Sequence, residues 1–244
     1  MIYGFIGMSL LFVAIGLAVT EKNSKYILSG YNTMSEENRM KVDIRAYIPF
    51  FRKFHIFLGV SLLLIGSPLT YLISEGVGGI FLSVYPILAY IYFFVTSRKY
   101  SKGISTKGNT AAIVIMVGTL LFVMGMIGYG LKEDKLIFES QALVFEGHYA
   151  ETLVPSEIQS IELVDQLPQI TFKINGFGMG TVRKGYFRTK DREVVKLIIN
   201  ADQKPIILVT KMDGGKIFYS ARSNTNGKVI KELKEALPKV TYKQ

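Results

Sequence analysis

The stretch GNTAAIVIMVGTLLFVMGMIGYGLKEDK, residues 108–135, marks the point at which this chain changes character. Residues 108–131 contain no Asp, Glu, Lys or Arg, whereas the next four residues are all charged. A helix needs about 20 predominantly apolar residues to cross the hydrocarbon core of a membrane. The stretch therefore predicts a membrane-spanning helix that ends at residue 131 and a second domain from residue 132.

Three more apolar runs precede this one, at roughly residues 1–20, 54–74 and 76–97, and they also lack Asp, Glu, Lys and Arg. A buried helix of a soluble protein seldom stays uncharged for that length. The first run could instead be a cleaved signal peptide. However, no Lys or Arg precedes its apolar core and no clear cleavage site follows it. We therefore predict a bundle of four transmembrane helices over residues 1–131.

The basic residues predict which side of the membrane each loop faces. The loop at about 21–53 contains seven Lys and Arg residues and the loop at 97–108 contains four, whereas the turn at 73–79 contains none. Loops rich in Lys and Arg stay on the cytoplasmic side. In a multi-pass protein of the cell membrane with four crossings, the N-terminus and the domain at 132–244 are therefore expected to be extracytoplasmic.

The net charge of +10 does not indicate a nucleic-acid partner, because eleven of the basic residues lie in those two loops. Nucleic-acid binding would need a clustered basic face with aromatic stacking platforms. The absence of cysteine excludes disulfides and thiolate metal sites. Uncharged apolar runs also disfavour transport or proton relay. His55, at the edge of the second run, is expected to be an interfacial residue rather than a metal ligand, because zinc needs three or four ligands.

From Lys135 onward, short alternating runs separated by turns predict a mainly β domain of six or seven strands. The sequence Asp-Gly-Gly at 213–215 predicts a hairpin turn, since these residues tolerate positive φ. Residues 155–158 predict a single helical turn. Asn224 or Thr225 can cap a C-terminal amphipathic helix, which Pro238 would end.

This order of elements resembles bacterial pleckstrin-homology-like (PH) domains of the type found on membrane proteins. The matching features are PSEIQSIELVD at 155–165, a glycine-rich segment leading into GYFRTKD at 185–191, the strand pair around Asp-Gly-Gly and the final helix. The resemblance implies a strongly bent antiparallel sheet with a C-terminal helix. It does not imply phosphoinositide binding, because bacterial members largely lack a defined ligand.

The membrane half contains a second resemblance. Leu-Ser-Gly-Tyr-Asn-Thr-Met at 28–34, after the first apolar segment, resembles a family of small bacterial membrane proteins of unknown function, and the likeness extends over roughly residues 1–100. That family has no established chemistry to carry over. The structural interpretation of the motif is a turn at the inner face that packs Tyr31 and Met34 against the helices.

The segment INGFGMGTVRKGYF at 174–187 raises the question of a phosphate-binding loop, since Gly176, Gly178 and Gly180 precede basic residues. A dinucleotide fingerprint needs a strand, then glycines, then a helix, and a Walker loop needs a Lys-Ser or Lys-Thr pair. Here β-forming residues follow the glycines. The segment is therefore predicted to be a hairpin loop or a bulged strand.

A cluster of basic residues follows those glycines and supplies the candidate ligand-binding or lipid-binding residues: Arg183, Lys184, Arg188, Lys190 and Arg192. Facing a bilayer, each cation could add about 1 kcal/mol of attraction to anionic headgroups. The alternative is a solvated basic edge that discourages strand pairing with other molecules. Asp191 and Glu193 dilute the cluster, which favours the alternative.

These patterns predict a non-enzymatic integral membrane protein that presents its β domain for binding or scaffolding at the bacterial cell surface. No catalytic residue, metal site or cofactor is predicted, and His148 is the only histidine of the domain. The expected partners are the lipid bilayer and an envelope protein or peptide. Deletion of residues 132–244 should then abolish partner recovery. The alternative is immunity or resistance to a membrane-active peptide or bacteriocin, which a peptide challenge would test; an envelope enzyme is less expected.

Overall fold

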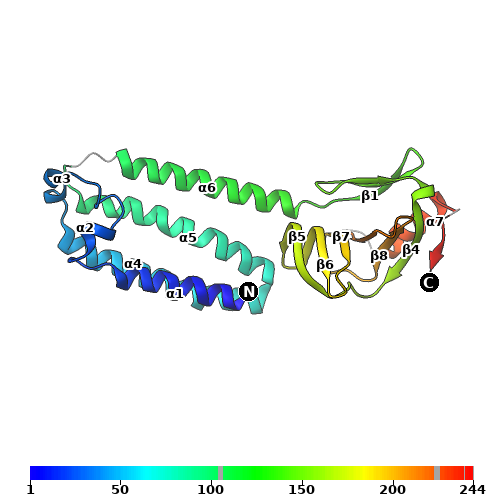
Figure 1. Cartoon of the computed structure of the whole chain (residues 1–244), viewed down its shortest axis with the longest axis horizontal. Coiled ribbons are helices and arrows are strands. Elements are labelled where there is room, and N and C mark those ends of the chain that lie inside the picture. The colour runs from blue at the N-terminus through cyan, green and yellow to red at the C-terminus, as the bar shows by residue number, and fades with distance from the viewer. Residues whose placement is uncertain (104–106, 223–225, 239, 244) are drawn as a thin grey trace. The chain divides into compact units, whose positions relative to one another are not determined.

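The computed structural model describes residues 1–244 except 104–106, 223–225, 239 and 244. The chain divides into two compact units, Met1–Ile127 and Gly128–Gln244. Helices build the first unit, and strands build most of the second (Figure 1). The expected combination of a helical half and a mainly β half is confirmed.

Within the described residues, three helical segments are long and apolar enough to cross a membrane: Ile44–Ile73, Glu75–Tyr100 and Lys107–Leu131. Helix α1, Ile2–Ala18, is also apolar but has only 17 residues. The remaining elements of these segments and loops are α2 (Ser24–Ile27), α3 (Glu36–Met40), α4 (Ile44–Pro68), the π-helix η1 (Leu69–Ile73), α5 (Glu75–Ser97), the 3₁₀-helix η2 (Arg98–Tyr100) and α6 (Lys107–Leu131).

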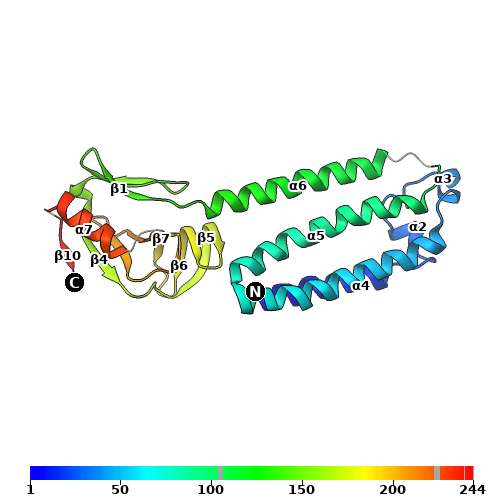
Figure 2. The same cartoon turned by 180° about the vertical axis from the view of Figure 1, so that it is seen from behind.

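Helices α1 and α4 lie side by side along the length of α1 (Figure 2). Ser9 Oγ donates a hydrogen bond of 2.7 Å to the carbonyl oxygen of Gly59. A Cβ added to Gly59 would lie 2.6 Å from the Ser9 carbonyl oxygen, and one added to Gly16 would lie 2.9 Å from His55 Cβ. Small residues at such positions let two helix backbones approach closely.

His55 is buried between the helices. Its side chain is 2% exposed. Nδ1 donates to the Phe51 carbonyl oxygen at 2.8 Å, so Nε2 can accept from the Tyr90 hydroxyl at 3.1 Å. The aromatic side chains of α4 and α5, including Phe51 and Phe93, surround it. Within the motif at 28–34, Leu28 and Tyr31 pack against the same helical core.

The second unit contains a three-stranded antiparallel sheet, β1 (Leu136–Glu139), β2 (Ala142–Phe145) and β3 (Glu151–Leu153). A seven-stranded sheet follows in the order β10-β4-β8-β9-β7-β6-β5. Its strands are β4 (Ile158–Val164), β5 (Ile170–Met179), β6 (Val182–Thr189), β7 (Val194–Ile199), β8 (Ile206–Lys211), β9 (Lys216–Ser220) and β10 (Tyr242–Lys243).

The larger sheet is mixed, so the expectation of a purely antiparallel sheet is wrong. Strands β7 and β9 pair in parallel, as do β10 and β4. Strand β9 lies between β8 and β7 in the sheet. Along the chain, β8 follows β7 and runs in the opposite direction, and β9 reverses direction again after the hairpin turn, so β9 runs parallel to β7. The hairpin turn at 213–215 and the helical turn η3 (Pro155–Glu157) are both where they are expected.

The glycine-rich segment is part of the β5–β6 hairpin, as predicted. Gly176 has φ +149°, and a Cβ there would lie 2.2 Å from the Lys184 carbonyl oxygen of the paired strand. Gly180 adopts φ +58° in the turn between the strands. Both positions need glycine, because their positive φ angles are unfavourable for residues that have a Cβ. No phosphate-binding helix follows them.

Two apolar cores cover the two faces of the larger sheet. One core includes the three-stranded sheet and helix α7 (Asn226–Ala236), whose Val229, Ile230 and Leu233 are buried. The predicted caps Asn224 and Thr225 lie outside the described residues. At the start of α7, Asn226 Oδ1 accepts a hydrogen bond of 2.9 Å from the Ala221 backbone N–H.

Candidate functional site

One row of paired side chains runs from the core of the β domain to its surface. The pairs join Tyr186 on β6 to Lys196 on β7, Lys196 to Ile217 on β9, and Ile217 to Val209 on β8. Directly paired residues point to the same face of a sheet. Val209 and Ile217 belong to the core beneath α7, whereas Tyr186 is 39% exposed. This face of the sheet is therefore covered at one end and open at the other.

The open end carries apolar side chains in the neighbouring row. Phe172 on β5 pairs with Arg188 on β6, which pairs with Val194 on β7. Phe172 is 61% exposed and Val194 is 48% exposed. Arg188 is also exposed and lies two residues from Tyr186, on the same side of β6. We call Phe172, Tyr186, Arg188 and Val194 the exposed patch.

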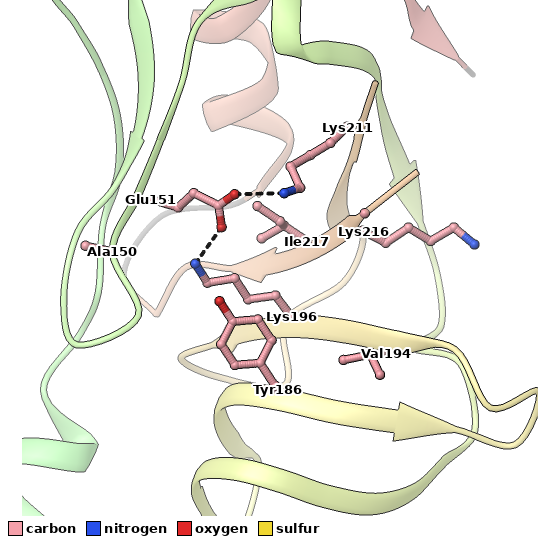
Figure 3. Close-up of a pocket in the computed structure, with 9 residues that line it drawn as sticks. Ala150, Glu151, Tyr186, Val194, Lys196, Lys211, Lys216 and Ile217 are labelled. Atoms are coloured by element: carbon pink, nitrogen blue, oxygen red, sulfur yellow. Dashed lines mark hydrogen bonds and ion pairs between the residues drawn. The ribbon is translucent and has the colours of Figure 1, made fainter. Parts of the chain in front are cut away.

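A cavity of about 340 Å³ adjoins the exposed patch. Tyr186 and Val194 form part of its wall, and Glu151 on β3 lies across from them (Figure 3). Figure 3 shows the amines of Lys196 and Lys211 directed at Glu151, with distances of 2.7 Å to Oε2 and 3.1 Å to Oε1. One carboxylate thus joins the small sheet to two strands of the larger sheet.

Each charged side chain of this cavity has a partner of opposite charge, which for Lys216 is Glu193 outside the cavity. Burial alone would raise the pKa of the Glu151 carboxyl, but its hydrogen bonds and charge attraction with Lys196 and Lys211 lower that pKa below its ordinary value. The pKa of Lys211 is raised, because bonds to Glu151 and Asp213 outweigh the opposing effect of burial. Lys196 also lies 5.7 Å over the Tyr186 ring. The cavity therefore has a neutralised polar floor beside an aromatic and apolar wall.

The structure separates the five basic residues that the sequence proposes as a site. Lys184 is 3% exposed, its amine lies 3.1 Å from Asp134 Oδ1, and it donates to the Lys132 carbonyl oxygen. Burial lowers the pKa of the Lys184 amine, although Asp134 opposes that effect. The prediction that Lys184 is available to a lipid or ligand is wrong, because the chain that enters the domain covers it.

The other four candidates do not form one cluster. Arg183 is half-buried and faces the opposite side of β6 from Arg188, because side chains alternate along a strand. Lys190 and Arg192 are exposed in the turn after β6. Only Arg188 belongs to the exposed patch. Sequence reasoning missed the apolar members, since the alternation around Phe172 does not show whether another element covers it.

His148 does not form a catalytic arrangement with acidic neighbours in the described part of the chain. Its Nδ1 lies 3.3 Å from the Tyr129 hydroxyl, and its ring contacts Tyr149 edge-on. Tyr149 in turn donates to Asn175 Oδ1 at 3.1 Å. Among the described residues, no group of three or more His, Cys, Asp or Glu side chains could hold a metal ion.

Comparison with known proteins gives a family match in the helical half of the chain. Residues 6–101 match the model of a family described as a domain of unknown function (DUF3784). No curated protein and no solved structure matches the chain. The matched region includes α1, α4 and α5 and ends before α6 and the β domain. The chain is therefore a membrane-type protein of unknown function whose helical half is similar to this domain over residues 6–101.

Proposed function

We propose that this chain is a non-enzymatic, multi-pass membrane protein that uses its β domain to bind an extended segment of a peptide or protein. The observation that carries the proposal is the exposed patch, where Phe172 and Val194 leave apolar surface open beside the Glu151 cavity. Helix α7 and the small sheet cover the remainder of that face. Exposed apolar surface of this kind is typical of interaction sites.

An extended segment suits this surface because β5 is the last strand of the sheet. Its ten residues pair with β6 on one side and with no described strand on the other. The free N–H and C=O groups of an edge strand can pair with an added strand. On the face of the exposed patch, the side chains of that strand would lie next to Phe172, and Arg188 lies one strand further in. Because every second residue of a strand points to the same face, a segment with an apolar and an acidic residue two positions apart complements both.

The side of the membrane follows from the basic loops. If the loops at 21–53 and 97–108 are cytoplasmic, α6 leaves the cytoplasm and the β domain is extracytoplasmic. This conclusion does not depend on whether α1 crosses. We infer that α1 is a fourth span, because it lies beside α4 and its 17 residues extend about 25 Å. The position of α7 supports kinship with pleckstrin-homology-like domains, whereas the parallel β7–β9 pair departs from it.

Peptide selection tests the binding proposal. Random linear peptides displayed on phage would be selected on the full chain in lipid nanodiscs. Selected peptides should contain an apolar and an acidic residue two positions apart, and Phe172→Ser/Val194→Ser should lower their affinity for the chain about tenfold or more. The matched control is Phe138→Ser/Val154→Ser, which changes exposed apolar residues outside the patch and should leave binding intact. Equal loss in both variants, or no selected peptide, would show that the patch is not a peptide site.

A further inference from the structure

A second cavity lies at the basic end of the helical unit. It has a volume of about 710 Å³ and is lined by the turn after α1 and by the first half of α4. Ile48, Pro49, Arg52 and Lys53 are spaced so that they share one side of α4. Lys22, from the turn after α1, lines the opposite wall. The cavity therefore lies between α4 and the turn that follows α1.

The cations of this cavity differ from those of the Glu151 cavity in having no carboxylate partner. Among the residues that the structure describes, no ion pair joins Lys22, Arg52 or Lys53 to an acidic side chain, and all three are exposed. Glu21 also lines the cavity, so the formal charge of the cavity is +2 (three cations and one anion). Unpaired cations with free N–H donors are suited to a phosphate group.

The position of the cavity favours a lipid over a free anion. Arg52 and Lys53 directly precede the apolar part of α4, which begins at residue 54. They therefore lie where a membrane helix passes from the hydrocarbon core to the headgroup layer. Ile48 and Pro49 add an apolar wall. A phospholipid offers a phosphate for the cations, and its carbon chains would lie along the apolar part of α4 that begins at residue 54.

We propose that this cavity binds an anionic phospholipid, with its phosphate held by Lys22, Arg52 and Lys53. A basic cavity between membrane helices at the cytoplasmic side is the arrangement that selects anionic over zwitterionic headgroups. The general bias of basic residues toward cytoplasmic loops would attract anionic lipid without a preferred position. The two explanations differ in whether the cations that line the cavity contribute more to the affinity for anionic lipid than other cations of the same loop do.

Native mass spectrometry of the full chain in detergent, titrated with phosphatidylglycerol or phosphatidylcholine, measures this difference. The chain should retain phosphatidylglycerol preferentially, and Arg52→Gln/Lys53→Gln should lower that affinity about 30-fold, which corresponds to about 2 kcal/mol at about 1.4 kcal/mol per tenfold. The control Lys25→Gln/Arg45→Gln removes the same charge from the same loop outside the cavity and should have a much smaller effect.

A second variant tests the site without changing a residue of α4. Lys22→Gln changes an exposed residue of the turn and should lower the affinity about fivefold. Equal losses from the cavity pair and the control pair would overturn the site, as would equal retention of the two lipids. Displacement of the lipid by a large excess of inorganic phosphate would assign the cavity to a free anion and overturn it as a lipid site.

Discussion

Replacement of Lys184 by methionine is expected to lower the free energy of unfolding of the β domain by about 3 kcal/mol or more. The Lys184 and Asp134 side chains are only 4% and 7% exposed and lie 3.1 Å apart. Asp134 Oδ2 is buried without a hydrogen-bond partner among the described residues. Loss of the lysine would leave the Asp134 carboxylate buried without its cation. The free-energy cost of that unpaired charge exceeds the net contribution of the ion pair to stability.

Pulse proteolysis of the full chain in urea, followed through a C-terminal tag, would measure this change. Arg188→Met is the matched control, because it removes the same charge from an exposed site of the same strand and should cost less than about 0.5 kcal/mol. The double variant Lys184→Met/Asp134→Asn should recover part of the loss. Equal stability of the Lys184 and Arg188 variants would contradict the burial of Lys184.

Replacement of Gly59 by alanine is expected to destabilise the helical unit by about 1–3 kcal/mol. The added Cβ would lie 2.6 Å from the Ser9 carbonyl oxygen and 2.9 Å from Val13 Cγ2. The first of these atoms is backbone, so the contact can be relieved only if α1 moves away from α4. That movement would also lengthen the hydrogen bond from Ser9 Oγ to the Gly59 carbonyl oxygen.

Thermal denaturation of the full chain in detergent would measure the effect of Gly59→Ala. Gly118→Ala is the control, because a Cβ at Gly118 on α6 would meet no atom within 4 Å. The control should be neutral or slightly stabilising, since alanine favours helix more than glycine does. A control variant that is as unstable as Gly59→Ala would show that the α1–α4 contact is not the cause.

The apolar runs locate the membrane helices well, but they do not give the full length of each helix. The run at 108–131 coincides with α6, Lys107–Leu131. The run at 54–74 begins ten residues after the start of α4 at Ile44. The helix itself begins at Ile44 and includes Arg45, Arg52 and Lys53, because a membrane helix can extend beyond the hydrocarbon into the headgroup layer. Asp43 caps it by accepting a hydrogen bond from the Ala46 N–H at 3.1 Å. Hydropathy reports the environment of side chains rather than the limits of a helix.

The candidate site could be predicted less well, because it depends on contacts between distant segments. Lys184 and Arg188 lie on one side of β6, because side chains alternate along a strand. That alternation does not show that Asp134, fifty residues earlier, covers the first and leaves the second exposed. The parallel pairing of β7 and β9 is likewise decided by where a hairpin inserts into the sheet. The partnership of Glu151 with Lys196 and Lys211 joins three separate strands.

The side of the membrane on which the β domain lies tests the account most directly, since an extracytoplasmic peptide partner requires it. The chain contains no cysteine, so Thr33→Cys and Ser156→Cys each supply a single thiol at an exposed position. Intact cells would be treated with a membrane-impermeant maleimide, and lysed cells would show that both thiols can react. The account predicts labelling at residue 156 and not at residue 33 in intact cells. Labelling at residue 33 and not at 156 would place the β domain in the cytoplasm and contradict it.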